Sequence, residues 1–267
     1  MSGGRSIRSA IKRGDAELAL QLLHESSVGL DNSDKYKRTP LIYAARKGYA
    51  EVVRELVRAG AALDLQDMWG STALILAVDN GHIEVVKELV RAGAKLDLQD
   101  TYQETALIVA VRDGHMEVVR ELVRASAALD LQDWQYKTAL MHAVCNEMRD
   151  GTEVVKELVR AGAALDVEND EGKTALSMSS TTGVIRELLE AGAKLGSKGT
   201  ASALLQKMMH QHDGVRLKRV IAQPTLDWKG DVVTKIAKKH QKMDTATRNR
   251  NATILGRLGI VEQNWFR

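Results

Sequence analysis

The hydrophobic and polar positions between residues 39 and 60 predict two short helices. Apolar residues recur at the three- and four-residue spacing that places them on one helix face. They are Leu41, Ala44 and Ala45 in the first segment, and Val52, Val53, Leu56 and Val57 in the second. Thr39 is placed to cap the first helix through its side-chain oxygen, and Gly48 to end it. The second helix is expected from about Ala50 to Arg58, with Gly60 just after it.

The same pattern returns along the chain with a period of 33 residues. The threonines at 39, 72, 105 and 138 are each followed by a Pro-Leu or Ala-Leu pair. The predicted second helices are almost one string, repeated at Glu51–Arg58, Glu84–Arg91, Glu117–Arg124 and Glu153–Arg160. Between two such helix pairs the chain makes an extended excursion, as at 61–71, with a turn expected near Asp67 to Gly70.

On these residues the chain resembles the ankyrin-repeat family. That family has a 33-residue period, two helices and a turn per unit, and a Thr-Pro-Leu-His-x-Ala signature. The segment Thr39–Ala44 reads Thr-Pro-Leu-Ile-Tyr-Ala, which fits except at the histidine, and later copies lose the proline as well. Gly81-His82 and Gly114-His115 match the start of the turn to the second helix. The resemblance implies an all-α, ankyrin-repeat solenoid whose interior is a variant of the usual one.

We expect two regions along the chain. Residues 1–199 are predicted to form about six ankyrin repeats, the first of them a cap. Residues 200–267 are predicted to form a degenerate repeat and a basic, helical C-terminal cap, with closing helices at 232–240 and 252–260. Terminal units of such arrays need a polar outer face, and the lysine-rich composition suits that role.

Three irregularities interrupt the period. The spacing from Thr138 to Thr174 is 36 residues, which puts extra residues at 145–152, between two helices. The sixth repeat is shortened around 177–183. Ser126 stands where other copies have a glycine, at an expected cost of up to about 1 kcal/mol if its φ must be positive.

Composition agrees with thin, closely stacked helices. Apolar residues make up 44% of the chain but aromatic residues only 4%, and Ala, Leu and Val fill the difference. The single cysteine, Cys145, excludes an internal disulfide and every multi-cysteine metal motif. No apolar run approaches the ~20 residues that cross a bilayer. We expect an intracellular, cytoplasmic protein that is a monomer by itself, with the nucleus as the alternative location.

Catalytic and metal chemistry find little support. His142 and Cys145 lie three residues apart on a predicted helix, yet no orienting group or oxyanion site accompanies them. A stacking histidine and a surface cysteine are favoured instead. The histidines at 210, 212 and 240 lack the spacing of a zinc site. We therefore expect no enzyme activity, no metal and no cofactor.

Aspartates also recur at the repeat period, which is compatible with two roles. The rows are Asp64, Asp97, Asp130 and Asp166, and Asp67, Asp100 and Asp133. Arrayed carboxylates are compatible with calcium. Each aspartate lies at a predicted turn, however, where its side chain commonly bonds the backbone two residues on. We favour the turn.

Charge is distributed unevenly. The net charge of the whole chain is +3, but the segment from Gly196 onward contains 14 Lys or Arg residues and only 5 Asp or Glu residues. The candidate basic patch comprises Lys235, Lys238, Lys239 and Lys242, with Arg248 and Arg250 beyond it. A solvated cap or contact with an acidic protein is favoured, while binding to nucleic acid and use at a membrane or in targeting stay open. No RNA- or DNA-binding signature accompanies the patch.

Aromatic residues concentrate just before the repeat threonines. Half of the ten are Tyr36, Trp69, Tyr102, Trp134 and Tyr136. Tyr and Trp often dominate binding energy, so we predict that these residues bind a partner, although stacking between neighbouring turns is the alternative. Neighbouring groove positions vary between repeats and are also assigned to binding: Arg46, Asp79 and Arg112, with Cys145 next in the series.

The function expected from this resemblance is protein–protein interaction. Turn tips and first helices would line a concave face that holds a protein partner of unknown identity. A structural subunit of a large assembly and a nucleic-acid-associated protein are the alternatives.

Overall fold

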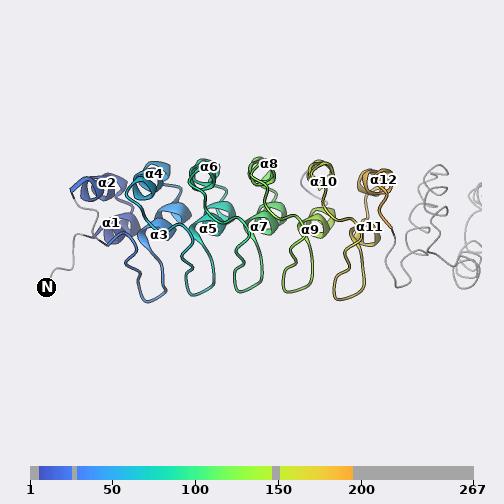
Figure 1. Cartoon of the computed structure of the whole chain (residues 1–267), viewed down its shortest axis with the longest axis horizontal. Helices are drawn as coiled ribbons and strands as arrows, with labels where there is room; N and C mark the ends of the chain where they lie inside the picture. Colours follow the sequence, from blue (N-terminus) through green and yellow to red (C-terminus); the bar gives the residue numbers. More distant parts are fainter. Residues whose placement is uncertain (1–5, 26–28, 146–150, 195–267) are drawn as a thin grey trace, which may run out of the picture. The chain divides into compact units, whose positions relative to one another are not determined.

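The computed structural model describes residues 6–25, 29–145 and 151–194, and within these ranges every regular element is an α-helix. The chain divides into two compact units, residues 1–163 and 164–267. In the first unit the helices form five successive pairs (Figure 1). They are α1 (Ile7–Arg13), α2 (Ala16–Glu25), α3 (Pro40–Lys47), α4 (Ala50–Arg58), α5 (Ala73–Asp79), α6 (Ile83–Arg91), α7 (Ala106–Asp113), α8 (Met116–Arg124), α9 (Ala139–Cys145) and α10 (Gly151–Arg160).

Within the first unit the odd-numbered helices form one row and the even-numbered helices a second row above it in Figure 1. Long loops project from the side of the first row, away from the second. This arrangement confirms the all-α repeat stack that the 33-residue period predicts. The helices α1 and α2 form the first of these pairs.

The first helices α3, α5, α7 and α9 begin directly after the predicted threonines. The backbone amides of Ile42, Ile75 and Ile108 donate to the side-chain oxygens of the threonines three residues earlier, at 3.2 Å in each case. These bonds satisfy amides that the helix itself leaves without partners. At the other end of α3, Gly48 takes the left-handed conformation, with φ +75°, as expected of a helix-ending glycine.

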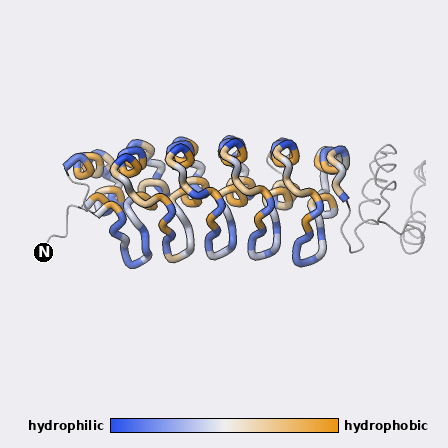
Figure 2. Tube along the Cα trace, viewed as in Figure 1, coloured by the Kyte–Doolittle hydropathy of each residue, from blue (hydrophilic) through white to orange (hydrophobic). Residues whose placement is uncertain are grey.

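The core lies between the two rows of helices and between successive pairs. Figure 2 shows hydrophobic positions on the facing sides of the helices and hydrophilic ones on the outer side of the even-numbered row. The predicted core leucines Leu41, Leu74, Leu107 and Leu140 are all buried. The small residues Ala44 and Ala45 are buried as well, which lets the next pair approach closely, since no long side chain holds the helices apart.

The second helices carry a solvated, charged face that also links neighbouring repeats. Val52, Val53 and Leu56 of α4 are buried as predicted, but Val57 is only half-buried because it lies at the margin of the apolar face. On the outer side Arg54 pairs with Glu51 at 2.7 Å within the helix, as the spacing predicts. It pairs also with Glu88 of the next repeat, at 3.0 Å.

The irregularities take clear structural forms. Ser126 has a φ of +65°, which confirms that it occupies a left-handed position otherwise held by glycine. In the second unit α11 (Ala175–Met178) is only four residues long and is followed by α12 (Thr182–Glu190), in agreement with a shortened repeat. Leu176 of α11 is buried. Residues 146–150, which contain most of the extra length, lie outside the described part.

The described residues end at 194, so several predictions lie beyond them. These are the degenerate repeat and closing helices of 200–267 and the basic residues Lys235, Lys238, Lys239 and Lys242. Among the helices that are described, none is long and apolar enough to cross a membrane.

Candidate protein-binding surface

The loops that project from the first row end in five-residue turns, which we call fingertips 1 to 4 in the first unit. They comprise residues 34–38, 67–71, 100–104 and 133–137. Each begins with an aspartate whose Oδ1 accepts two backbone hydrogen bonds from its own turn. At Asp67 these come from the amides of Trp69, at 2.9 Å, and Ser71, at 3.0 Å. The prediction that these aspartates shape turns is confirmed.

Backbone hydrogen bonds join each fingertip to the next. The amide of Met68 donates to the carbonyl of Tyr36 at 3.0 Å, that of Thr101 to Trp69 at 2.9 Å, and that of Trp134 to Tyr102 at 3.1 Å. The carbonyl oxygens in this series belong to aromatic residues. Their backbones are therefore held at a fixed spacing along the first unit.

A second set of side chains, which sequence reasoning missed, runs along the same loops. The side-chain amide of Gln66 donates to the carbonyl of Gly70, at 2.7 Å, and to that of Gln99 in the next loop, at 3.0 Å. Gln99 repeats both bonds, reaching Gln103 at 2.6 Å and Gln132 at 2.9 Å. The signal was available, because glutamine recurs at 66, 99 and 132 with the repeat period.

The other aspartate row has a different role from the one predicted. Asp64 Oδ1 accepts from the amide of Lys95 at 2.9 Å, and Asp97 Oδ1 from the amide of Ala128 at 2.8 Å. Both donors lie 31 residues on, in the following repeat, and not two residues on in the same turn. These aspartates connect repeats because the first part of the loop in one repeat packs beside the start of the loop in the next.

The fingertip aromatic rings differ in exposure. Tyr36 is half-buried and stacks on Trp69, with ring centroids 5.8 Å apart and planes inclined by 26°. This pair agrees with the stacking alternative. Trp69 nonetheless stays 41% exposed, and Tyr102, Trp134 and Tyr136 are 60%, 58% and 58% exposed. The last three rings are not accounted for by burial.

The structure also aligns the fingertips residue by residue. The amide of Gln135, not that of Trp134, bonds the fingertip aspartate two residues before it, at 2.8 Å, as the amide of Tyr102 does in fingertip 3. Trp134 therefore lies one position earlier in its turn than Tyr102 does. Tyr136 takes a φ of +57°, at the position that Gly70 takes in fingertip 2. Fingertip 4 thus presents two aromatic side chains that flank the position of the others.

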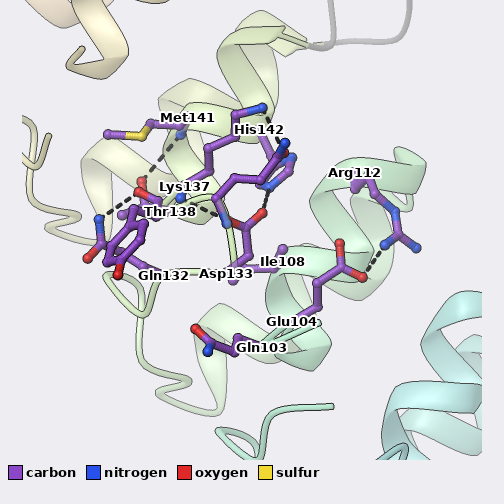
Figure 3. Close-up of polar contacts among 12 residues, drawn as sticks. Gln103, Glu104, Ile108, Arg112, Gln132, Asp133, Lys137, Thr138, Met141 and His142 are labelled. Carbon is purple, nitrogen blue, oxygen red and sulfur yellow. Dashed lines mark hydrogen bonds and ion pairs between the residues drawn. The ribbon is translucent and has the colours of Figure 1, made fainter. Parts of the chain in front are cut away.

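The predicted groove residues Asp79 and Arg112 pair with each other, with Arg112 Nη2 3.5 Å from Asp79 Oδ1. Arg112 also pairs with Glu104, drawn in Figure 3, and with Asp113, whose Oδ1 lies 3.0 Å from its Nε. Burial acts to lower the pKa of Arg112, but the hydrogen bonds to Asp113 and Glu104 outweigh it and raise that pKa. Arg112 is therefore a firmly positioned cation.

Arg46, the third predicted groove residue, lies in the last turn of α3 with its side chain exposed. Its backbone carbonyl contacts His82 Nε2 at 3.2 Å. The His82 ring in turn lies against Gly48, where an added Cβ would come within 2.7 Å of Nδ1. This glycine is therefore required by close approach as well as by its positive φ.

His142 and Cys145, the two residues considered as a nucleophilic pair, both lie on α9. His142 Nε2 lies 2.7 Å from Asp133 Oδ2, so the histidine bonds a fingertip carboxylate (Figure 3). Cys145 is exposed at the end of α9. Within the described ranges no group of three or more His, Cys, Asp or Glu side chains is arranged to hold a metal ion.

Comparison with known proteins identifies the fold. A family model described as ankyrin repeats in three copies matches residues 7–100, 89–152 and 107–199. The solved ankyrin repeat domain from Acinetobacter baumannii is 26% identical, with a TM-score of 0.65, over 70% of this chain and 98% of that one. The ankyrin repeat domain of Bcl-3, a member of the IkappaB family, is 28% identical, with a TM-score of 0.64, over 73% of this chain and 89% of that one. A comparison with curated proteins found no significant match.

Proposed function

The chain belongs to the ankyrin-repeat family, and from this premise we propose that it binds a protein partner through its fingertips and first helices. Stacked repeats of this kind provide extended surfaces for recognition and are in general interaction modules. In this chain the binding surface would comprise the aromatic fingertips and the groove residues Arg46, Asp79 and Arg112. The partner would lie along the concave side of the stack.

One observation carries the proposal. Every large hydrophobic side chain that is exposed in the described residues lies in the projecting loops of the first unit, and these are Leu65, Met68, Trp69, Tyr102, Trp134 and Tyr136. The apolar faces of the helices are closed by packing, so the loops are where apolar surface remains in contact with water. Clustered exposed aromatics are typical of surfaces that another protein covers.

Tyr136 adds a second argument. A residue other than glycine costs about 1–2 kcal/mol in the left-handed conformation. Tyr136 holds this conformation with its ring exposed, and its backbone contacts do not need the ring, since the amide bonds Asp133 at 2.9 Å and the carbonyl accepts from Gln132 at 2.6 Å. The aromatic ring is therefore not needed to form the turn. Lys37 and Gln103 hold the same left-handed position in fingertips 1 and 3, so the support for binding comes from the exposed ring and not from the backbone conformation.

The groove residues divide into two kinds of contact. Arg46 is exposed and forms no ion pair within the described residues, so its charge is available to a carboxylate of the partner. Arg112 is held by Asp79, Glu104 and Asp113, and therefore offers a fixed hydrogen-bonding edge. Such pre-positioned groups lose little side-chain entropy on binding.

The experiment compares proteins captured by the wild type with those captured by a variant in which Trp69, Tyr102 and Trp134 are all changed to Ala. Captured proteins are identified by mass spectrometry, and each single variant is measured against the partner so found. We expect the triple variant to lose the partner, since one such truncation at a binding hot spot costs about 2 kcal/mol or more.

A matched control removes three exposed residues from the opposite side of the stack, by changing Arg58, Arg91 and Arg124 to Ala. Circular dichroism and thermal melting report whether each variant is folded. Capture should survive in this control. Equal capture by the wild type and a folded fingertip variant would eliminate the fingertips as the binding surface.

A further inference from the structure

The four fingertip aspartates of the first unit use one carboxylate oxygen alike and the other differently. Oδ1 bonds the backbone of its own turn in every case. Oδ2 of Asp34 accepts from the Tyr43 hydroxyl at 2.7 Å, and Oδ2 of Asp133 lies 2.7 Å from His142 Nε2. These two partners come from the first helix that follows the fingertip.

In fingertip 2 the partner of the aspartate Oδ2 comes from a different element. The residue of the following helix that corresponds to Tyr43 is Leu76, which has no donor. The partner of Asp67 Oδ2 is instead a cation from fingertip 1, the Arg38 guanidinium, whose Nε lies 3.9 Å from it. The Arg38 guanidinium lies 4.7 Å from the Trp69 ring centroid and 5.2 Å from that of Tyr36. A guanidinium is therefore held between two aromatic rings and a carboxylate.

Fingertip 3 has the corresponding carboxylate and aromatic residues but no arginine at the corresponding position. One repeat on, Asp100 corresponds to Asp67, and Trp69 and Tyr102 correspond to Tyr36 and Trp69. The residue that corresponds to Arg38 is Ser71, which is too short to reach, and Val109 stands in place of Tyr43. Among the described residues, the contacts of the Asp100 carboxylate are the Oδ1 bonds from the amides of Tyr102 and Glu104.

The backbone geometry at fingertip 3 matches the occupied case. Thr101 bonds the carbonyl of Trp69 at 2.9 Å, as Met68 bonds that of Tyr36 at 3.0 Å. Asp100 is more exposed than Asp67, which is buried. The exposed Tyr102 ring stands two residues away. Asp100 is thus a half-buried carboxylate whose Oδ2 has no partner among the described residues, and its aromatic neighbours in sequence correspond to the pair that contacts Arg38 one repeat earlier.

We propose that an arginine side chain of the protein partner binds at Asp100, between Trp69 and Tyr102, as the chain's own Arg38 binds at Asp67. Arginine suits the site because its planar guanidinium stacks on aromatic rings while its N–H groups donate to a carboxylate. A lysine ammonium provides the charge but not the planar stacking surface. The proposal rests on the function proposed above and names the chemistry of the partner residue at its centre.

The test titrates the isotope-labelled full chain with N-acetyl-arginine amide and follows the backbone amides of residues 100–104 and the Trp69 indole by NMR. The control ligand is N-acetyl-citrulline amide, which has nearly the same shape but no charge. We expect saturable shifts at these positions with arginine, and affinity at least about tenfold weaker with citrulline, equivalent to about 1.4 kcal/mol. Equal responses to the two ligands, or no saturable response to arginine, would overturn the proposal.

Two substitutions locate the response. Asp100→Asn should abolish it, whereas Asp67→Asn should leave it intact. Both should fold, because Asn169 in the second unit accepts the same two turn amides through its Oδ1, from Glu171 at 3.1 Å and Lys173 at 2.9 Å. A response that persists in Asp100→Asn would rule out the assigned carboxylate.

A third variant, Ser71→Arg, supplies the missing guanidinium from the chain itself. It should compete with the ligand and remove the arginine response, while thermal melting reports that the variant is folded. A folded Ser71→Arg protein that still binds the ligand at residues 100–104 would contradict the inference. The two proposals also fail separately. Loss of partner capture in the fingertip variant without any arginine response refutes the arginine site alone, whereas an arginine response with unchanged capture refutes the proposed function alone.

Discussion

Replacing Ser126 with Gly should stabilise the protein, although it removes a side chain. Ser126 follows α8 with a φ of +65°, and the equivalent glycines after α4 and α6, Gly60 and Gly93, have φ values of +89° and +83°. A Cβ added at either glycine would meet nothing within 4 Å, so the side chain itself fits and the cost is conformational. The left-handed conformation costs an L-residue about 1–2 kcal/mol.

Part of this cost is offset in the wild type, because serine leaves the unfolded chain less conformational freedom than glycine does, a difference of about 0.4–1 kcal/mol in favour of serine. The net gain for Ser126→Gly is therefore on the order of 0.5–1 kcal/mol, and a gain of 1 kcal/mol raises the melting temperature by about 2–4 °C in a chain of 150–250 residues. The reciprocal Gly93→Ser should lose a similar amount. The shift in the urea midpoint at constant m-value measures both. If Gly93→Ser destabilises while Ser126→Gly changes nothing, strain at Ser126 is not the reason for the difference.

Two further predictions concern the core and the acid response. Leu107→Ala should lower the free energy of unfolding by about 2–5 kcal/mol, because Leu107 is 1% exposed and removing its side chain leaves a cavity in the closed core. Urea unfolding measures the change, and Leu65→Ala, at an exposed position, is the control. Burial would raise the pKa of Asp34, but hydrogen bonds from Tyr43 and two backbone amides lower it overall. A lowered folded-state pKa gives stability that is present above the unfolded pKa of about 3.9 and lost as the pH falls through the folded value. Asp34→Asn should therefore be less stable than the wild type at pH 7, and should lose less stability than the wild type between pH 5 and pH 2. Parallel curves of unfolding free energy against pH for the two proteins would contradict a stabilising role of the Asp34 carboxylate.

Contacts within one repeat were predictable from the sequence, because residue type and spacing decide them. A threonine before an apolar helix caps it, and Leu107 is buried because its position recurs with the same neighbours. Contacts between repeats were harder. The bond from the Lys95 amide to Asp64 depends on how closely one loop packs against the next, which no local spacing encodes. The Gln66 series was overlooked for the same reason, although its period was visible.

The candidate surface was predicted in part. The exposed positions of Tyr102 and Trp134 agree with their place in turns, but the offset of Trp134 by one residue became clear only from the hydrogen bonds of Gln135. The environment of Arg38 had no sequence signal of its own. Its guanidinium reaches a carboxylate 29 residues away, and only the stacking of fingertips brings the two together.

The bonds between fingertips have a consequence for how such a protein can change length. Each one joins the amide of a fingertip's second residue to the carbonyl of the preceding fingertip's third residue, as from Thr101 to Trp69 and from Trp134 to Tyr102. Excising residues 73–105 would join Thr72 to Ala106, and each donor left behind would meet the counterpart of its former acceptor. Duplication of the same stretch would be equally well matched. Gene rearrangement in multiples of 33 codons can therefore lengthen or shorten the row of fingertips without a new core, whereas an insertion of another size, like the one after Thr138, must be absorbed within its own repeat.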